Sequence, residues 1–188
     1  MKDLNAAKTG NNGDWDWFNE FLGIKMPSNY YTFHLFSKIC SEYNPHSIVE
    51  LGTHTGSMSV YLALEALKRG GRFTTIEIDH NLPSPEIKGI LVTLNAFIEN
   101  MDILSQEGRK EIKSMFIGKT FLLCDNGHKA DEFLAFVPHL KSGDVVAVHD
   151  YGTEFFDRDW EKLSDLVKPI YQDEWNKHNV QLCIFEVL

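Results

Sequence analysis

The sequence predicts an α/β protein with a doubly wound, mostly parallel β-sheet covered by helices on both faces. Short apolar stretches rich in β-branched residues alternate along the chain with stretches whose apolar residues recur at helical spacing. Most of the stretches predicted as strands are apolar along their whole length, as burial on both faces of a sheet requires. Alternating strands and helices need right-handed crossover connections, which place neighbouring strands parallel to one another.

Length, charge and cysteine content exclude several classes of protein. The chain has 188 residues, of which 43% are hydrophobic and 24% charged, as in a globular domain. The net charge of -9 argues against nucleic acid as the main partner. Three cysteines without a CxxC motif indicate a reducing compartment and no zinc site. No apolar run reaches about 18 residues and no signal core opens the chain, so we expect a cytoplasmic protein without a membrane partner.

The chain divides into an N-terminal segment, residues 1–27, and a single domain, residues 28–188. The first segment begins with a polar, Gly/Asn-rich arm, and an aromatic cluster follows it. The cluster forms either a short helix packed on the body or a flap over a pocket, and packing is favoured because large aromatic side chains usually anchor by burial. Its members are Trp15, Trp17, Phe18, Phe21 and Leu22.

The predicted elements of the domain begin with a helix over residues 28–43, in which Ser28 is the N-cap and Asn44-Pro45 ends the helix. Apolar periodicity and glycine positions define the elements after it. They are, in order, a strand at 47–51, a helix around 60–67, a strand at 73–78, a strand within 91–99, a helix at 107–116, a strand at 121–124, a helix at 133–140, a strand at 145–148, a helix around 160–167 and a strand at 181–187.

Ligands of open α/β sheets bind at the carboxyl ends of the strands, so the residues after each strand are the candidates for a site. After the first strand, Gly52 and Gly56 allow a sharp turn and close approach of a ligand. The helix that follows offers free N–H groups to a carboxylate. An ordinary glycine turn is the alternative.

Further polar residues follow the second and third strands. Glu77 comes 77 − 50 = 27 residues after Glu50, a spacing that suits one strand–helix–strand unit, and it can accept hydrogen bonds from ribose hydroxyls. Asn100, Met101 and Asp102 can surround an adenine ring, or they form a plain turn in which Asp102 caps the next helix.

Titratable residues follow the fourth and fifth strands, which gives two chemical alternatives. Asp125 and His128 follow one strand, and His149 and Asp150 end the next. Carboxylates at adjacent strand ends can hold a divalent cation, whereas a histidine can act as a base near neutral pH. Two such groups on neighbouring strands favour a site over a structural hydrogen bond.

Four segments together resemble a known family. Residues 48–57 resemble the first motif of class I S-adenosylmethionine-dependent methyltransferases, and residues 75–79 resemble their acidic second motif. Residues 122–128 and 146–151 are similar to later motifs of the branch that includes cephalosporin hydroxylase-like and macrolide sugar O-methyltransferase proteins. The resemblance covers roughly residues 30–188.

The resemblance implies a Rossmann-like sheet of seven strands whose last strand, residues 181–187, is antiparallel, with the sixth near residues 170–171. It implies S-adenosylmethionine as cofactor, with its methionine end at the glycine turn, its carboxylate near Ser57, its ribose on Glu77 and its adenine near Met101. The cofactor-binding residues so implied are Glu50, Gly52, Thr53, Gly56, Ser57, Glu77, Asn100, Met101, Asp102 and Asp125.

Metal-dependent members of this family use an aspartate after the fourth strand and two acidic or amide residues after the fifth. Asp125 and Asp150 match two of these positions, but His149 stands where a carboxylate is expected. Imidazole suits zinc, iron or manganese better than magnesium. The sequence thus leaves open a divalent cation on Asp125, His149 and Asp150, or metal-free catalysis by His149, Asp150 and His128.

The expected function is S-adenosylmethionine-dependent O-methylation of a small hydroxylated molecule, such as a sugar or secondary metabolite. One alternative is a catalytically inactive cofactor-binding or scaffold protein on the same fold. An NAD-dependent oxidoreductase is disfavoured because His54 stands where the second glycine of G-x-G-x-x-G is needed. The sequence does not identify the acceptor and leaves open whether the protein is a homo-oligomer.

Overall fold

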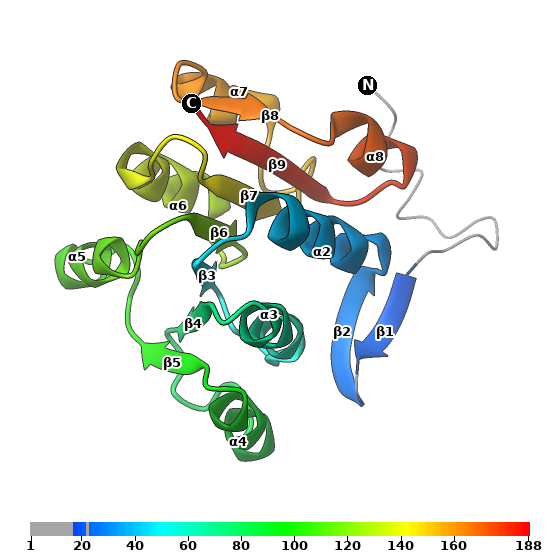
Figure 1. Ribbon diagram of the computed structural model, residues 1–188, viewed down its shortest axis with the longest axis vertical. Coiled ribbons are helices and arrows are strands. Elements are labelled where there is room, and N and C mark those ends of the chain that lie inside the picture. Colours follow the sequence, from blue (N-terminus) through cyan, green and yellow to red (C-terminus); the bar gives the residue numbers. More distant parts are fainter. Residues whose placement is uncertain (1–16, 22) are drawn as a thin grey trace.

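The computed structural model describes residues 17–21 and 23–188. It contains a central seven-stranded sheet with the strand order β5-β4-β3-β6-β7-β9-β8, and a separate antiparallel pair, β1-β2 (Figure 1). The strands are β1 (Trp17–Phe21), β2 (Ile24–Asn29), β3 (Ser47–Leu51), β4 (Arg72–Glu77), β5 (Phe97–Asn100), β6 (Thr120–Cys124), β7 (Val145–His149), β8 (Val167–Pro169) and β9 (Leu182–Val187).

The central sheet confirms the predicted fold class. Strands β3 to β7 pair in parallel, and β9 runs antiparallel to both β7 and β8. Every residue of β3 and of β6 is buried, as two-sided burial of these mostly apolar strands requires. The last strand is therefore the antiparallel one, as the family resemblance implies.

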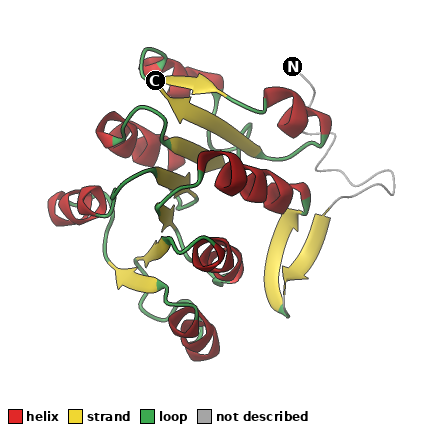
Figure 2. Cartoon of the chain, in the orientation of Figure 1, coloured by secondary structure: helices red, strands yellow, loops and turns green. Residues whose placement is uncertain are grey.

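Helices cover both faces of this sheet, with α2, α3 and α4 on one side and α5 and α6 on the other (Figure 2). The helices are α2 (Tyr31–Tyr43), α3 (Ser57–Lys68), α4 (Pro85–Thr93), α5 (Gln106–Ser114), α6 (Lys129–Phe136), α7 (Asp157–Trp160) and α8 (Gln172–Lys177), with the short 3-10 helices η1 (Val137–His139) and η2 (Glu161–Leu163).

The N-terminal elements differ from the prediction. Residues 17–21 form strand β1 rather than a short helix, and the boundary drawn at 27/28 falls inside β2. Packing on the body is confirmed for Phe21, whose ring centroid lies 5.0 Å from that of Phe33. Ser28 belongs to β2, and the N-cap of α2 is Tyr30 rather than Ser28. Next to it, Asn29 Oδ1 accepts from the Tyr31 N–H (2.8 Å). Trp15 and Leu22 lie outside the described residues.

Helix α4 was not predicted from the sequence, and the strand predicted within 91–99 is confirmed only at its end, as β5. Ser84 is the N-cap of α4, and Pro85 is its first residue. Ser-Pro is a strong helix start signal because proline has the φ of a helix and needs no hydrogen-bond partner at that position.

The predicted helix around 160–167 is wrong in its second half. Helix α7 and η2 end at Leu163, and Val167 begins strand β8, which pairs with β9 at the sheet edge. The sixth strand therefore ends at Pro169, just before the predicted position, and the short helix α8 follows. Strand β8 has only three residues, too few to leave a strand pattern in the sequence.

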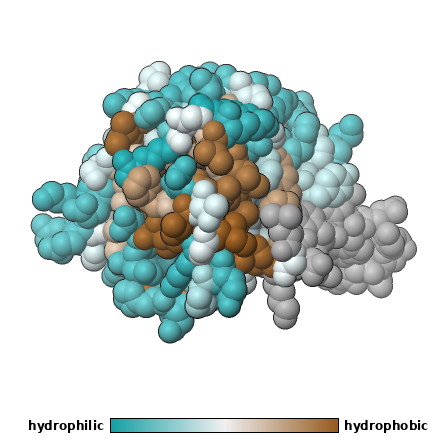
Figure 3. Space-filling model, turned by 60° about the horizontal axis from the view of Figure 1, so that its bottom comes forward, coloured by the Kyte–Doolittle hydropathy of each residue, from teal (hydrophilic) through white to brown (hydrophobic). Residues whose placement is uncertain are grey.

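Apolar side chains also reach the surface. Hydrophobic side chains gather near the centre of the face shown in Figure 3. Helices α3 and α4, which pack against each other, carry exposed large apolar side chains, namely Leu64, Leu67, Ile90 and Val92. Within the described residues, none of the helices has the length and apolar character needed to span a membrane.

Candidate functional site

The predicted site residues lie at the carboxyl ends of β3, β4, β6 and β7. The chain proceeds from β3 outward to β5, then returns to β6 on the other side of β3 and proceeds to β7. The boundary between β3 and β6 is therefore the switch point of the sheet, where open α/β sheets bind their ligands.

The bend after β3 passes against the end of β6. Gly52 has a φ of +100°, and a Cβ atom on it would lie 2.6 Å from the carbonyl oxygen of Asp125. The Gly52 N–H donates to the Ile76 carbonyl (2.9 Å), and the Asp125 N–H donates to the Leu51 carbonyl (2.9 Å). Strands on both sides thus fix the bend, and only glycine fits at its first position.

The start of α3 is an uncapped helix N-terminus. Gly56 occupies the N-cap position with a φ of +83° and provides no side-chain cap. The next residue, Ser57, is 1% exposed, and its Oγ has no hydrogen-bond partner among the described residues. Free N–H groups and a buried hydroxyl without a partner suit a bound carboxylate.

A buried hydrogen-bond network beside the bend joins the ends of β3 and β4 to the start of α3. The Thr75 hydroxyl donates to Glu50 Oε2 (2.7 Å), the Ser59 hydroxyl donates to the same oxygen, and Thr53 Oγ1 lies 2.6 Å from Thr75 Oγ1. Glu50 Oε1 is buried without a described partner. Burial raises the pKa of Glu50 to about 8, although the hydrogen bonds from Ser59 and Thr75 oppose the rise.

Replacing Glu50 with glutamine is expected to flatten the dependence of stability on pH. The pKa of about 8 in the folded state exceeds the ordinary value of 4.5, so the folded protein holds a proton that the unfolded chain releases. Between these values stability falls as pH rises, by at most about 1.4 kcal/mol per pH unit. Urea unfolding of wild type and Glu50→Gln across this range measures the difference. Glu111→Gln, on an exposed residue, is the control and should retain the wild-type slope.

Glu77 directs its carboxylate toward the bend. Its Oε2 accepts from the His54 N–H (2.8 Å), and its Oε1 accepts from the N–H groups of Ile78 (2.9 Å) and Asp79 (3.2 Å). A carboxylate offers about four acceptor positions, so these three bonds leave capacity for a hydroxyl donor. Glu77, which is predicted to bind the ribose, therefore contacts the predicted glycine turn directly.

The residues after β5 lie beside Glu77. The Asn100 side chain donates to the Glu77 carbonyl (3.1 Å), and Met101 is half-buried against the core. Asp102 Oδ1 accepts from the backbone N–H two residues later (3.0 Å), whereas Ser105 caps α5. The alternative in which Asp102 caps that helix is wrong.

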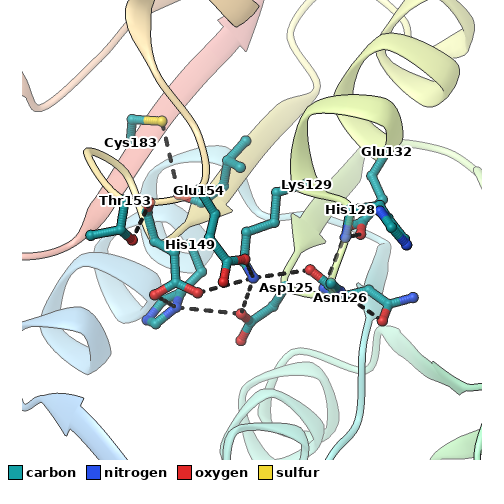
Figure 4. A network of polar contacts seen from close by, with 12 residues as sticks. Asp125, Asn126, His128, Lys129, Glu132, His149, Thr153, Glu154 and Cys183 are labelled. Carbon is teal, nitrogen blue, oxygen red and sulfur yellow. Dashed lines mark hydrogen bonds and ion pairs between the residues drawn. The ribbon is translucent and has the colours of Figure 1, made fainter.

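The ends of β6 and β7 bring three predicted residues together. His149 Nδ1 lies 3.3 Å from Asp125 Oδ1 (Figure 4). It also lies 3.3 Å from Asp150 Oδ1. One donor atom from each residue lies within 4.8 Å of the others, a spacing that a metal ion can bridge. Asp150 has a φ of +57°, which is uncommon for a residue other than glycine and turns the chain sharply at the strand end.

A fourth residue of this group, Lys129, was not predicted from the sequence. Its ammonium lies 2.9 Å from Asp150 Oδ2, 2.8 Å from Glu154 Oε2 and 3.9 Å from Asp125 Oδ1 (Figure 4). Its side chain is only 5% exposed. We call Asp125, Lys129, His149, Asp150 and Glu154 the polar cluster.

Charges within the polar cluster shift the pKa values of its members. Burial lowers the pKa of His149, but the charges of Asp125 and Asp150 outweigh burial and raise it to about 9. Burial raises the pKa of Asp125. Burial also acts to raise the pKa of Asp150, but hydrogen bonds from His149 and Lys129 outweigh it and lower that pKa. The cluster therefore contains an imidazolium and an ammonium among carboxylates at neutral pH.

His128, the other histidine predicted for catalysis, lies apart from His149 (Figure 4). It is exposed at the N-cap of α6. Its backbone N–H donates to the buried carboxylate of Glu132 (3.2 Å), and burial raises the pKa of Glu132 to about 8. The structure thus groups His149, but not the His128 ring, with the carboxylates.

Solved structures with the same arrangement of strands and helices include O-methyltransferases. CmcI superimposes with a TM-score of 0.70 over 100% of this chain and 85% of its own, at 16% identity. The O-methyltransferase TomG from Streptomyces achromogenes superimposes with a TM-score of 0.55 over 83% of this chain and 79% of its own, also at 16% identity. The chain has the methyltransferase fold. The resemblance drawn from the sequence is confirmed at this level.

Curated relatives of the sequence point the same way. Rhamnosyl O-methyltransferases of Mycobacterium bovis and Mycobacterium tuberculosis are 26% identical to the chain over 136 residues, which are 69% of this chain and 56% of theirs. The chain thus spans a little over half the length of these relatives. No family model matches the sequence.

Two members of the polar cluster, Lys129 and Glu154, were not predicted from the sequence, and Lys129 is the first residue of α6. The sequence predicts the start of this helix near Phe133, whereas the helix begins at Lys129. Ala130 and Phe133 already continue the apolar spacing of Phe136 toward the N-terminus of that helix. This spacing indicates that the helix starts soon after β6, which ends at Cys124, and so places Lys129 at the carboxyl edge of the sheet, here called the rim.

Proposed function

We propose that the protein transfers a methyl group from S-adenosylmethionine to a hydroxyl oxygen of a small molecule, such as a sugar or secondary metabolite. The observation that carries this proposal is the contact between Glu77 and the glycine bend, in which the His54 N–H donates to Glu77 Oε2 at 2.8 Å. This contact joins a carboxylate suited to ribose hydroxyls with a helix N-terminus suited to a carboxylate, at the switch point of the sheet.

Two buried oxygens without a described hydrogen-bond partner support the proposed cofactor-binding site. Glu50 Oε1 and Ser57 Oγ are buried on either side of the bend without described partners. The ammonium and carboxylate of the cofactor's amino-acid portion match them chemically. Asn100 and Met101 border the adenine position, while Thr53 orients Glu50 through Thr75. CmcI and TomG have both been solved with SAM.

His149 is the residue that we propose to act on the acceptor hydroxyl. When bound, S-adenosylmethionine supplies a methyl group on a positively charged sulfur for in-line transfer to oxygen. Asp125 and Asp150 hold Nδ1 of His149, and no described residue hydrogen-bonds to its Nε2. In its neutral form His149 takes the hydroxyl proton of the acceptor at Nε2 and later releases it to water. Orientation of a histidine by a carboxylate on the opposite nitrogen is the arrangement that such a base requires.

A divalent cation on Asp125, His149 and Asp150 is the alternative to a histidine base. CmcI has been solved with Mg and SAM, and MycE with Mg, SAH and mycinamycin VI. In this chain, however, the Lys129 ammonium forms an ion pair with Asp150 Oδ2 at 2.9 Å and therefore competes with a cation for this carboxylate. The residues present therefore do not suit a divalent cation, and we assign no step to one.

Binding of S-adenosylhomocysteine, measured by calorimetry, tests the cofactor proposal. We expect binding to the wild-type protein and a loss of roughly 10- to 100-fold in affinity in Glu77→Gln, because a hydrogen bond to a charged group is removed. Asp79→Asn is the matched control, since the exposed Asp79 carboxylate bonds only to Asn81 among the described residues. Absence of binding to the wild-type protein would disprove the proposal, and binding of NADH instead would favour an oxidoreductase.

Activity separates an enzyme from a cofactor-binding scaffold on the same fold. We expect methyl transfer to at least one member of a panel of sugars and hydroxylated secondary metabolites. Cofactor binding without transfer to any of them favours the scaffold. The partner proposed is thus a small-molecule acceptor.

The proposal also includes a location in the cytoplasm and association of the chain with a second copy. All three cysteines are buried and unpaired, which agrees with a reducing compartment such as the cytoplasm. Exposed apolar side chains on α3 and α4 favour association with a second copy of the chain. Light scattering measures the oligomeric state.

A further inference from the structure

Lys129 is a buried lysine whose ammonium group is fully engaged. Its three N–H donors face three acceptors at hydrogen-bond distance, which are the Asn126 carbonyl (2.9 Å), Asp150 Oδ2 (2.9 Å) and Glu154 Oε2 (2.8 Å). Lysine is rarely buried unless it is paired in this way. The charge is therefore held at one position by the fold rather than by a flexible surface contact.

The groups around Lys129 come from separate parts of the rim. Asn126 follows β6, Asp150 follows β7, and Glu154 lies in the turn beyond it. Asp125 Oδ1 lies 3.9 Å from the same ammonium and 3.3 Å from His149 Nδ1. One positive charge thus neutralises and orients the two carboxylates that hold His149.

A divalent cation bound by such carboxylates would bring positive charge to the same place. We infer that Lys129 takes the place of the metal ion, so that this methyltransferase site works with a cation that belongs to its own chain. Lys129 acts as a positioning residue, because its side chain is only 5% exposed and its ammonium is already held by the Asn126 carbonyl, Glu154 and Asp150. The inference rests on the proposed function and adds that the reaction needs no divalent metal.

The geometry of the cluster favours this assignment over a metal with Lys129 as a neighbour. A metal ion shared by Asp125 and Asp150 would lie next to the ammonium that bonds to Asp150 Oδ2 and would be repelled by it. His149 completes the substitution, since it stands where a third oxygen ligand would otherwise be expected. Its Nδ1 lies 3.3 Å from one oxygen of each carboxylate, so the imidazole pairs with both of them.

Binding of Mn²⁺, followed by the loss of its free paramagnetic resonance signal, tests the inference without relying on activity. We expect no binding to the wild-type protein. In Lys129→Met, which keeps the length of the side chain and removes its charge, we expect Mn²⁺ to bind, because the ammonium that repels the ion is gone. Lys162→Met is the matched control, because Lys162 is 55% exposed and pairs with Asp159 away from the polar cluster.

Methyl-transfer activity provides the second readout. Wild-type activity should be the same in EDTA and in Mg²⁺. Lys129→Met should lose roughly 10- to 100-fold in EDTA and recover part of this loss in Mg²⁺ or Mn²⁺. A lysine that only stabilises the fold would give a loss that metal ions do not restore, and this result would overturn the inference.

Wild-type protein that binds Mn²⁺, or that loses activity in EDTA and regains it with Mg²⁺, would also overturn it. If Lys129→Met does not fold, these two wild-type measurements decide, since metal independence supports the inference and metal dependence contradicts it. Failure of the proposed function is recognised separately, because it appears as absent binding of S-adenosylhomocysteine whatever the result with Mn²⁺.

Discussion

Replacing His149 with asparagine is expected to lower the rate of methyl transfer by about 10²- to 10⁴-fold, the usual contribution of a general base. Asparagine keeps a donor near the position of Nδ1, where Asp125 and Asp150 lie 3.3 Å away, but it removes Nε2. Binding of S-adenosylhomocysteine should therefore change little while kcat falls. The measurement is a comparison of kcat and cofactor affinity in the wild type and the variant.

Two further histidine variants make this result specific. His139→Asn, on an exposed residue of η1 at the opposite end of the sheet, is the control and should leave kcat unchanged. His128→Asn tests the second histidine at the rim. If it loses activity while His149→Asn does not, the base is His128 and the assignment to His149 is wrong.

The same base predicts how the reaction depends on pH. The charges of Asp125 and Asp150 outweigh burial and raise the pKa of His149 from 6.5 to about 9. Only the neutral imidazole accepts a proton, so kcat/KM should rise by about tenfold per pH unit below pH 9 and then level off. A profile that levels off near the ordinary histidine pKa would show that the carboxylates do not control His149.

Stability should change in the opposite direction over the same range. Because the folded-state pKa of His149 exceeds that of the unfolded chain, its favourable contribution is complete below pH 6.5 and is lost as pH rises through about 9. Activity and stability therefore respond with opposite signs to the titration of one residue.

The positions of the cofactor residues could be predicted because they depend on chain order alone. Once β3 and β4 are recognised, Gly52 and Glu77 must follow them at the same edge of a parallel sheet. The contact between the two, through the His54 N–H, then follows from neighbouring strands of a parallel pair. No knowledge of side-chain packing is needed for this step.

The composition of the polar cluster could not be predicted in full for a different reason. Lys129 and Glu154 reach Asp150 only because β6 and β7 pair in the register that sets Cys124 opposite Val148 and because α6 begins directly at the rim. Register and helix starts are set by tertiary packing, which leaves a weak trace in one sequence. The sequence therefore predicts the Asp150 carboxylate but not Lys129, its charged partner.

Replacing Gly52 with alanine is expected to destabilise the fold by about 3 kcal/mol or more, the range of substitutions that force the backbone to move. The new Cβ would lie 2.6 Å from the Asp125 carbonyl oxygen, and the φ of +100° is itself unfavourable for alanine. Gly70→Ala is the matched control. Gly70 also has a positive φ, of +65°, but nothing lies within 4 Å of its Cβ position, so it should lose only about 1–2 kcal/mol.

Thermal unfolding separates the two glycine variants, since 1 kcal/mol corresponds to roughly 2–4 °C for a chain of this size. The Gly52 variant should also lose function in a way that the Gly70 variant does not. Because Gly52 packs on the backbone of Asp125, relief of the clash displaces this carboxylate from His149, so cofactor affinity and kcat should fall together. Equal unfolding temperatures for the two variants would mean that β3 and β6 separate easily at the rim, and a site built across their boundary could not keep its geometry.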